Sequence, residues 1–277
     1  MTLRPAQGDA DATAATTTAE PAVRVEVAGA LAVVTIDRPA ALNALSAQVL
    51  GELEHAFVEL STEGSGIRGV LLVGAGGRAF VAGADIRAMS SLGPTEAAEL
   101  ARLGHRAAAA IEALPAPVIA CVDGFALGGG LEIALACDFI YATDASQFGQ
   151  PEVQLGLVPG FGGTVRLPRA VGVARAKELI YTGRRIGIDE AVDSGLVVRR
   201  FADRDALLEG ARATVGEIAA NSASAVGIAK RVLVEAAGRP TDAASDLEIA
   251  GFEDAFRTDD MHEGVAAFLE KRAPRFS

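Results

Sequence analysis

Tryptophan is absent from this chain and cysteine is scarce. Aromatic residues make up only 5% of the 277 residues, although half of the residues are apolar. Alanine, valine, leucine and isoleucine must therefore build the core. The two cysteines, Cys121 and Cys137, both lie in apolar runs and form no CxxC pair. We therefore expect reduced, buried thiols and neither a disulfide framework nor a metal site built on cysteine.

Long apolar runs and basic patches are also missing. No apolar stretch reaches the roughly 18 residues of a membrane span, and the N-terminus lacks a basic segment followed by an apolar one. The formal net charge is -11, and no local cluster of Lys and Arg offsets it. Because such a chain repels phosphate backbones, the sequence predicts a cytoplasmic protein that binds neither a membrane nor a nucleic acid.

The composition divides the chain into three parts. Residues 1–20 are rich in Ala, Thr and Asp without apolar periodicity, which predicts a disordered tail. Residues 21–203 alternate between strand and helix patterns, which predicts an α/β core with largely parallel strands. Strand patterns end near Asp203, so residues 204–277 are predicted to form an all-helical C-terminal region. We find no internal repeat of fixed period in the sequence.

Hydrophobic periodicity locates the longer elements. Val23–Val27 alternates apolar and polar residues and, together with Leu31–Ile36, predicts a β-hairpin. Apolar residues along one stripe predict a helix over Ser46–Leu60. Further strands are expected at 67–73, 117–122 and 137–142, and further helices at 94–114, 206–220, 223–237, 246–256 and 261–271.

The strongest local signal is the glycine-rich segment 124–132, which directly follows a predicted buried strand. Its glycines permit close approach by a ligand, and a helix that begins near Gly129 presents free N–H groups and the positive end of its dipole. Such a helix start can hold an anion or an oxyanion. Glu132 lies about one turn further on and can face the same site. A glycine-rich packing turn followed by a surface glutamate explains the pattern equally well.

A second signal is the stretch 148–164, which we interpret as an irregular loop because it is rich in Gly and Pro. It carries one carboxylate, Glu152, and such loops often carry function. A solvated glutamate is the alternative. A third signal is the segment 80–86, which offers backbone N–H groups in a glycine-containing turn. Asp85 in this segment either caps a helix or binds a ligand.

Three familiar motifs are not supported. The segment 74–79 fits the dinucleotide pattern G-x-G-x-x-A after a strand, but the residues that follow do not read as a helix. No Lys-Ser or Lys-Thr follows the glycines, so a P-loop is absent from the sequence. The histidines His55, His105 and His262 all lie on predicted helices, which does not favour a Ser-His-Asp triad.

Taken together, the three segments resemble the crotonase (enoyl-CoA hydratase/isomerase) family. The resemblance covers roughly residues 23–277 and rests on the segment FGQPEVQLGLVPGFGGTVRL, the Gly-Gly-Gly-x-Glu run and the Ala-Gly-Ala-Asp-Ile run, in the order and spacing of the family. The ending FLEKR is also similar to the C-terminal helix of the family. The resemblance implies a spiral of ββα units followed by a helical region, and assembly as a homotrimer or a homohexamer built from two trimers.

The resemblance also implies roles for particular residues. By motif position, the backbone N–H groups of Ala84 and Gly129 form an oxyanion hole, and Glu132 and Glu152 are the catalytic pair. The positions implied to bind CoA are Ala82, Ala84, Asp85, Ile86, Arg87, Phe268 and Lys271, of which the last two often reach CoA in a neighbouring subunit. No metal or redox cofactor is implied, because CoA is part of the substrate.

Both glutamates are present, which favours enoyl-CoA hydratase: reversible addition of water to a 2-trans-enoyl-CoA to give a 3-hydroxyacyl-CoA. Many relatives that keep one glutamate run isomerisation or other enolate chemistry, so an enoyl-CoA isomerase is the alternative enzyme. Some crotonase-like proteins bind RNA instead, which the acidic charge and the intact pair disfavour. Phe161 either limits the acyl pocket or packs a loop. The sequence does not determine the length or branching of the acyl chain of the substrate. Fatty-acid β-oxidation is the expected pathway, with branched-chain, aromatic and secondary metabolism as alternatives.

Overall fold

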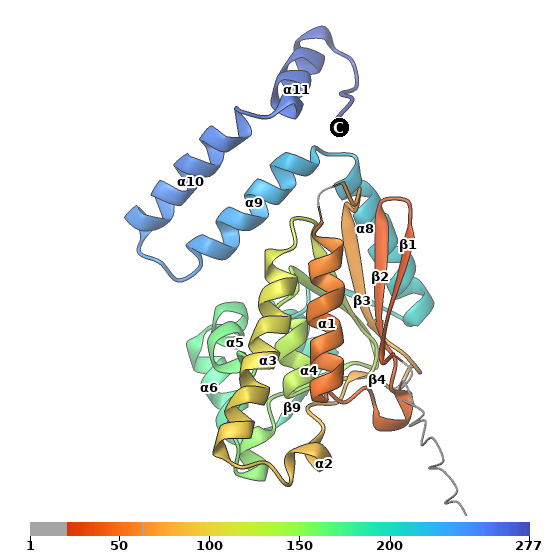
Figure 1. Ribbon diagram of the computed structural model, residues 1–277, viewed down its shortest axis with the longest axis vertical. Helices are drawn as coiled ribbons and strands as arrows, with labels where there is room; N and C mark the ends of the chain where they lie inside the picture. Colours follow the sequence, from red (N-terminus) through yellow and green to blue (C-terminus); the bar gives the residue numbers. More distant parts are fainter. Residues whose placement is uncertain (1–20, 63) are drawn as a thin grey trace, which may run out of the picture.

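The computed structural model describes residues 21–62 and 64–277. The tail predicted at residues 1–20 lies outside the described residues. The remaining chain forms two sheets surrounded by helices, with three C-terminal helices extending from one end (Figure 1).

The larger sheet has six strands in the order β1-β2-β3-β5-β7-β10. β1 and β2 form the predicted antiparallel hairpin, and each later strand of this sheet joins it in parallel. Its strands are β1 (Val23–Ala28), β2 (Leu31–Ile36), β3 (Gly69–Gly74), β5 (Val118–Val122), β7 (Phe139–Thr143) and β10 (Arg199–Phe201). The central strands are apolar throughout because helices cover both faces of the sheet.

A smaller sheet of four short strands, in the order β4-β6-β8-β9, lies at the carboxyl end of the larger one. Its strands are β4 (Ala79–Val81), β6 (Phe125–Leu127), β8 (Gln147–Gly149) and β9 (Arg185–Gly187). The pairs β3/β4, β5/β6 and β7/β8 each send one strand to each sheet. This repeated step along the chain is the spiral of ββα units that the resemblance implies.

Helices sandwich the larger sheet because neighbouring residues of each strand point to opposite faces. Val70 and Leu72 of β3 belong to the main core, which also contains the buried stripe of α1. Leu71 and Val73 face the other way and pack with the buried face of α8. The helices of these layers are α1 (Ala47–Leu60), α3 (Pro94–Ala113), α4 (Gly129–Ala134) and α8 (Arg204–Ala219).

Short elements connect these layers and close the smaller sheet. They are the 3-10 helices η1 (Pro39–Ala41) and η2 (Glu152–Leu155) and the helices α2 (Ile86–Met89), α5 (Gly163–Val171), α6 (Val173–Thr182) and α7 (Ile188–Asp193). The stretch expected to be an irregular loop at 148–164 therefore contains the end of β8, all of η2 and the start of α5. Three- and four-residue elements are too short to show periodicity in the sequence.

The last three helices, α9 (Ala223–Ala236), α10 (Thr241–Ala255) and α11 (Asp259–Glu270), confirm the expected helical content of the C-terminal part. They extend from the upper end of the molecule, and α10 lies along α9 (Figure 1). α10 begins at Thr241, five residues earlier than expected at Asp246, because Pro240 sets the helix start.

Both cysteines are free and buried, as expected. Burial raises the pKa of Cys121 to about 12 and raises that of Cys137 well above the usual range of a thiol. Within residues 21–62 and 64–277, no helix is long and apolar enough to cross a membrane.

Candidate active site

Glu132 lies in the first turn of α4, immediately after the glycine-rich segment, and only 1% of its surface is exposed. Its Oε1 accepts hydrogen bonds from two backbone amides, Phe161 N at 2.8 Å and Gly163 N at 2.6 Å. Oε2 accepts no hydrogen bond from any residue in the described part of the chain. One oxygen is therefore fixed by the backbone, and the other is left for a bound molecule.

The charge on Glu132 is set by opposing effects. Burial raises the pKa of this carboxyl, because a charged group loses its hydration in the interior. The amides of Gly163 and Phe161 and the positive charge of Arg166 act in the opposite direction. Burial outweighs these contacts, so the pKa of Glu132 lies above its usual value, and the fixed dipoles offset only part of the cost of burying the charge.

Glu152 is the first residue of η2 and is only half-buried. Burial and the neighbouring charge of Glu132 raise the pKa of Glu152 to about 7. When the amide of Gln150 is oriented to donate, its nitrogen lies 2.7 and 3.1 Å from the two carboxylate oxygens of Glu152. The structure therefore brings the two glutamates close enough to influence each other electrostatically.

Gly128 connects three of the candidate segments. A methyl group added at this residue would lie 2.9 Å from Oε1 of Glu152 and 3.9 Å from Cα of Gly83. Gly128 also has φ 51° and ψ -126°, a conformation that residues with a side chain rarely adopt. Only glycine therefore allows the start of α4 to lie directly against both Glu152 and the segment that contains Ala84.

The predicted oxyanion donors, Ala84 N and Gly129 N, belong to the residues that directly follow Gly83 and Gly128. Around Ala84, Leu45 N donates to Gly83 O and Asp85 N donates to Leu45 O, both at 2.9 Å. Gly128 N donates to Gly149 O, while Gly129 is the first residue of α4. Among residues 21–62 and 64–277, the N–H groups of Ala84 and Gly129 have no hydrogen-bond acceptor. Both donors are thus available to a ligand oxygen, although their catalytic role stays a prediction.

The segment predicted to hold CoA borders the same site. Ala82 and Ala84 are half-buried, whereas Ile86 and Arg87 are exposed on α2. Asp85 caps α2 by accepting a hydrogen bond from Ala88 N, which confirms the helix-cap interpretation. Its other oxygen pairs with Arg38 at 3.2 Å. Contact of this segment with CoA stays a prediction.

A cavity of about 540 Å³ begins beside this segment, between α1, α2 and α3. Its lining is mixed, with apolar side chains such as Leu45 and Leu103 and charged ones such as Asp85 and Arg102. A mixed lining of this kind suits a ligand that has both an apolar chain and a polar body.

Helix α11, which contains Phe268 and is followed by Lys271, lies at the opposite end of the molecule from α2 (Figure 1). Phe268 is 82% exposed on α11, and Lys271 follows the helix in a left-handed conformation. A single chain does not bring these two residues to the site, so a contact with CoA would have to come from a neighbouring copy.

Phe161 is buried between two helices and packs the loop that precedes α5. Its ring lies against Gly129 of α4 and Gly104 of α3, where an added methyl group would collide with it. The structure thus shows the packing role directly, and the effect of Phe161 on the acyl pocket stays a prediction.

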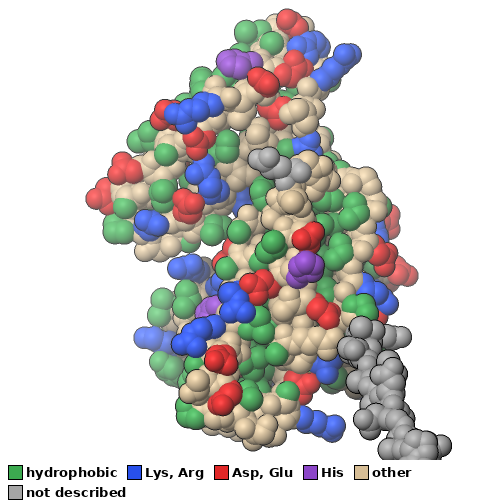
Figure 2. Space-filling view, viewed as in Figure 1, with side chains coloured by type: hydrophobic (Ala, Val, Ile, Leu, Met, Phe, Trp, Pro, Cys, Tyr) green, Lys and Arg blue, Asp and Glu red, His purple; other side chains and the backbone are tan. Residues whose placement is uncertain are grey.

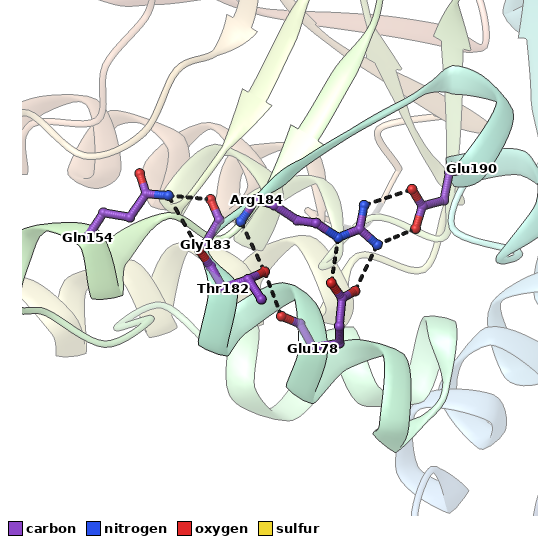
Figure 3. Close-up of polar contacts among 6 residues, drawn as sticks. All are labelled: Gln154, Glu178, Thr182, Gly183, Arg184 and Glu190. Carbon is purple, nitrogen blue, oxygen red and sulfur yellow. Dashed lines mark hydrogen bonds and ion pairs between the residues drawn. The ribbon is translucent and has the colours of Figure 1, made fainter.

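Glu152 has a support that the sequence did not reveal. Gln154, in the same short helix, donates from Nε2 to Gly183 O at 3.0 Å. Gly183 follows α6, and next to it Arg184 binds the carboxylates of Glu178 and Glu190 (Figure 3). This network ties the Glu152 turn to the end of α6. No local pattern signals it, because Gln154 and Gly183 are 29 residues apart.

Comparison with known proteins identifies the family of the chain. A family model described as enoyl-CoA hydratase/isomerase matches residues 26–277. A short-chain-enoyl-CoA hydratase of Clostridium acetobutylicum is 42% identical over 250 residues, which cover 90% of this chain and 95% of that protein. A crotonyl-CoA hydratase of Syntrophomonas wolfei is 43% identical over 246 residues, covering 89% and 94%.

Solved structures show the same fold. The crystal structure of an enoyl-CoA hydratase from Bacillus anthracis superposes with a TM-score of 0.87 at 37% identity, covering 92% of this chain and 98% of that one. The family model spans more than half of the sequence, and both relatives exceed 40% identity over nearly their whole length. The chain therefore belongs to the enoyl-CoA hydratase/isomerase family.

Proposed function

We propose that this protein is an enoyl-CoA hydratase, which adds water reversibly to a 2-trans-enoyl-CoA to give a 3-hydroxyacyl-CoA. The observation that carries the proposal is the grouping of Glu132 and Glu152 with two backbone N–H groups that find no acceptor in the described part of the chain. Relatives named as hydratases, at more than 40% identity, support it.

The two N–H groups supply the electrostatic part of the reaction. Attack of water on the β-carbon moves an electron pair toward the thioester oxygen, which becomes an enolate oxyanion. Donation from Ala84 N and Gly129 N stabilises this charge, and one such donor contributes about 3–4 kcal/mol to the transition state. Because both amides belong to the backbone, they are aimed at the oxygen before the substrate arrives.

The two carboxyl groups supply the proton transfers. We assign Glu132 to water activation, because two amides hold Oε1 and no described residue donates a hydrogen bond to Oε2. The water proton passes to Glu132 as the new C–O bond forms at the β-carbon. Glu152, with a pKa of about 7, delivers its proton to the α-carbon as the enolate collapses. The cycle closes when a proton returns from Glu132 to Glu152 through solvent.

This chemistry requires no metal or redox cofactor, so we propose that none is resident and that CoA enters only as part of the substrate. The relatives named for short-chain and crotonyl substrates favour a short acyl chain. A cytoplasmic location and a role in fatty-acid metabolism are proposed with this substrate class.

We further propose that the protein assembles as a homotrimer or a dimer of trimers. Its C-terminal helices expose several large apolar side chains: Ile249, Phe252, Phe256, Phe268 and Leu269. Hydrophobic side chains reach the surface along these helices in Figure 2. An exposed apolar surface of this kind is typical of a subunit interface, and assembly would also bring Phe268 and Lys271 near another copy's CoA.

The function is tested by following the ultraviolet absorbance of the conjugated enoyl thioester with crotonyl-CoA and longer 2-enoyl-CoAs. We expect rapid loss of absorbance with the wild-type protein and almost none with Glu132→Gln. Interconversion of 3-enoyl- and 2-enoyl-CoA without hydration would contradict the proposal and indicate an isomerase.

A further inference from the structure

A partly buried ion pair lies behind Glu132, between α3 and α5. The side chain of Arg166 is 13% exposed and binds Glu112 through two nitrogens, Nε to Oε1 at 2.7 Å and Nη2 to Oε2 at 2.8 Å. This paired geometry fixes the plane of the guanidinium more firmly than a single contact. The two residues are 54 positions apart in the sequence, so the pair also joins the two helices.

Arg166 holds the loop that precedes α5 at two points. Its Nη1 donates to Phe161 O at 3.1 Å, and its own backbone N donates to Gly162 O at 2.8 Å. The guanidinium passes directly over Gly162, at a place where an added methyl group would collide with Nη1. The backbone from Phe161 to Gly163 is therefore held against a side chain that Glu112 fixes.

This is the segment whose amides bind Glu132. Phe161 accepts from Arg166 through its carbonyl and donates to Oε1 of Glu132 through its N–H. The same residue thus transmits the position of Arg166 to the carboxylate. The hydrogen bonds of the Arg166 side chain within the described residues go to Glu112 and Phe161, and none goes to Ala84, Gly129 or Glu152.

We propose that Arg166, anchored by Glu112, is a positioning residue: it aims the Phe161 and Gly163 amides at Oε1 of Glu132 and leaves Oε2 directed at the substrate water. The inference rests on the proposed hydration, since it assigns Glu132 as the base. In this proposal, the position and the charge of the base, Glu132, depend on the ion pair between Arg166 and Glu112.

Four charged or titratable groups lie on the described elements near Glu132. Arg166 faces it from α5, Glu152 from η2, and Glu112 and His105 lie on α3, where His105 is beside Gly162. Removing the positive charge of Arg166 should raise the pKa of Glu132, whereas removing the negative charge of Glu112 should lower it. A merely structural role predicts no such difference in sign.

The experiment compares Arg166→Gln, Arg166→Lys and Glu112→Gln with wild type, using kcat, KM and the pH profile. We expect Arg166→Gln to lower kcat about 10- to 100-fold with little change in KM, because a misplaced base slows the chemical step. Arg166→Lys keeps the charge but loses the paired geometry, so it should lower kcat without moving the acid limb. The control is Arg200→Gln, which removes an exposed arginine bound to Asp144 and Asp189. It should leave kcat, KM and the pH profile unchanged.

The acid limb of the kcat/KM profile reports the pKa of Glu132 in the free enzyme. We expect it to move to higher pH in Arg166→Gln, by about one unit, and to lower pH in Glu112→Gln. Equal losses of kcat in the two Arg166 variants, with no shift of the acid limb in any variant, would overturn the proposal. Shifts of the same sign in Arg166→Gln and Glu112→Gln would also overturn it.

A measurement without turnover separates this inference from the proposed function. Infrared titration of the carboxyl C=O stretch, taken as the difference between each protein and its Glu132→Gln variant, gives the pKa of Glu132 directly. If the wild-type protein hydrated no enoyl-CoA, the proposed function would fail, and the infrared shifts would still test the role of Arg166. If Arg166→Gln did not fold, the other two variants would test the proposal. It requires a lower pKa of Glu132 in Glu112→Gln and an unchanged pKa of Glu132 in Arg166→Lys.

Discussion

Glu132 and Glu152 carry the same functional group, but the chain holds them in different ways. Glu132 lies within a helix, is almost completely buried and has one oxygen fixed by two backbone amides. Glu152 begins a single turn of 3-10 helix, is half-buried and is supported by the side chains of Gln150 and Gln154. Both carboxyl groups have a raised pKa. The difference in their supports matches the proposed roles, since a base must be aimed by fixed donors, whereas an acid needs access to protons from solvent.

Replacing either carboxyl group should produce the largest effect. We expect Glu132→Gln and Glu152→Gln each to lower kcat by about 10²- to 10⁴-fold, because each removes one of two proton transfers. Glutamine at 132 still offers an oxygen to the two amides, so the fold should persist. The measurement is kcat with a 2-enoyl-CoA beside thermal unfolding, and the control is Asp189→Asn at an exposed carboxylate. Turnover near the wild-type rate in either variant would refute the paired mechanism.

The contact between Gly128 and Glu152 offers a test of geometry. Gly128→Ala should lower kcat about 10- to 100-fold, because the new methyl group would lie 2.9 Å from Oε1 of Glu152 and displace this carboxyl group. Gly156→Ala is the matched control: this glycine also has a positive φ, of 73°, but an added methyl group meets no atom within 4 Å. The control should lose about 1 kcal/mol of stability and keep its activity. Equal activity losses in both variants would indicate backbone strain as the cause.

The pH dependence of the activity distinguishes the roles of the two carboxyl groups. Hydration needs Glu132 ionised and Glu152 protonated, so kcat/KM should fall above about pH 7 as Glu152 loses its proton, by about tenfold per unit. The dehydration direction should show the same profile, because both directions use the singly protonated pair. Assays in both directions across the pH range measure it, and activity that is constant to pH 9, or about two units above this pKa, would contradict the assignment.

The same raised pKa has a consequence for stability. Between its ordinary value of 4.5 and about 7, Glu152 keeps its proton in the folded protein but loses it in the unfolded chain. The folded state then binds more protons, so its stability falls as the pH rises through this window. Urea unfolding at several pH values should show this loss in wild type and a smaller one in Glu152→Gln.

Loosening the support of Glu152 should have the smallest effect. Gln154→Ala removes the hydrogen bonds from Nε2 to Gly183 O at 3.0 Å and to Thr182 O at 3.5 Å, and the shorter one is worth about 1 kcal/mol. We expect kcat to fall less than tenfold and the alkaline limb to stay in place. Gln48→Ala, which removes an exposed side-chain contact on α1, is the control. A loss as large as that of Glu152→Gln would show that the turn is far less stable than its contacts suggest.

The longer elements of the fold were predictable because each has its own periodicity. The stripe of α1 and the apolar runs of β3 and β5 are visible within a few residues of sequence, and Ser46 marks the start of its helix by capping it. The strands of the smaller sheet have three residues each, and their pairing depends on segments far away in the sequence. Nothing local distinguishes them from loops.

The candidate site also combines features that are visible in the local sequence with features that depend on residues far apart in it. Glycine-rich segments and their glutamates were visible as motifs, and the resemblance to a family gave them roles. The residues that hold Glu132 were not predictable, because Phe161 and Gly163 are 29 and 31 positions away. Arg166 also reads as an ordinary helix residue until the fold places it against Glu112.

The two buried thiols lie on opposite sides of the larger sheet. Cys121 packs with the residues that face α8, whereas Cys137 belongs to the core that contains α1 and Glu132's neighbours. Because a buried thiol with a raised pKa reacts only after local opening, the alkylation rate of each cysteine measures how often its own layer separates. Mass spectrometry of the alkylated native protein can therefore compare how often the two layers open locally, without a cysteine introduced by mutation.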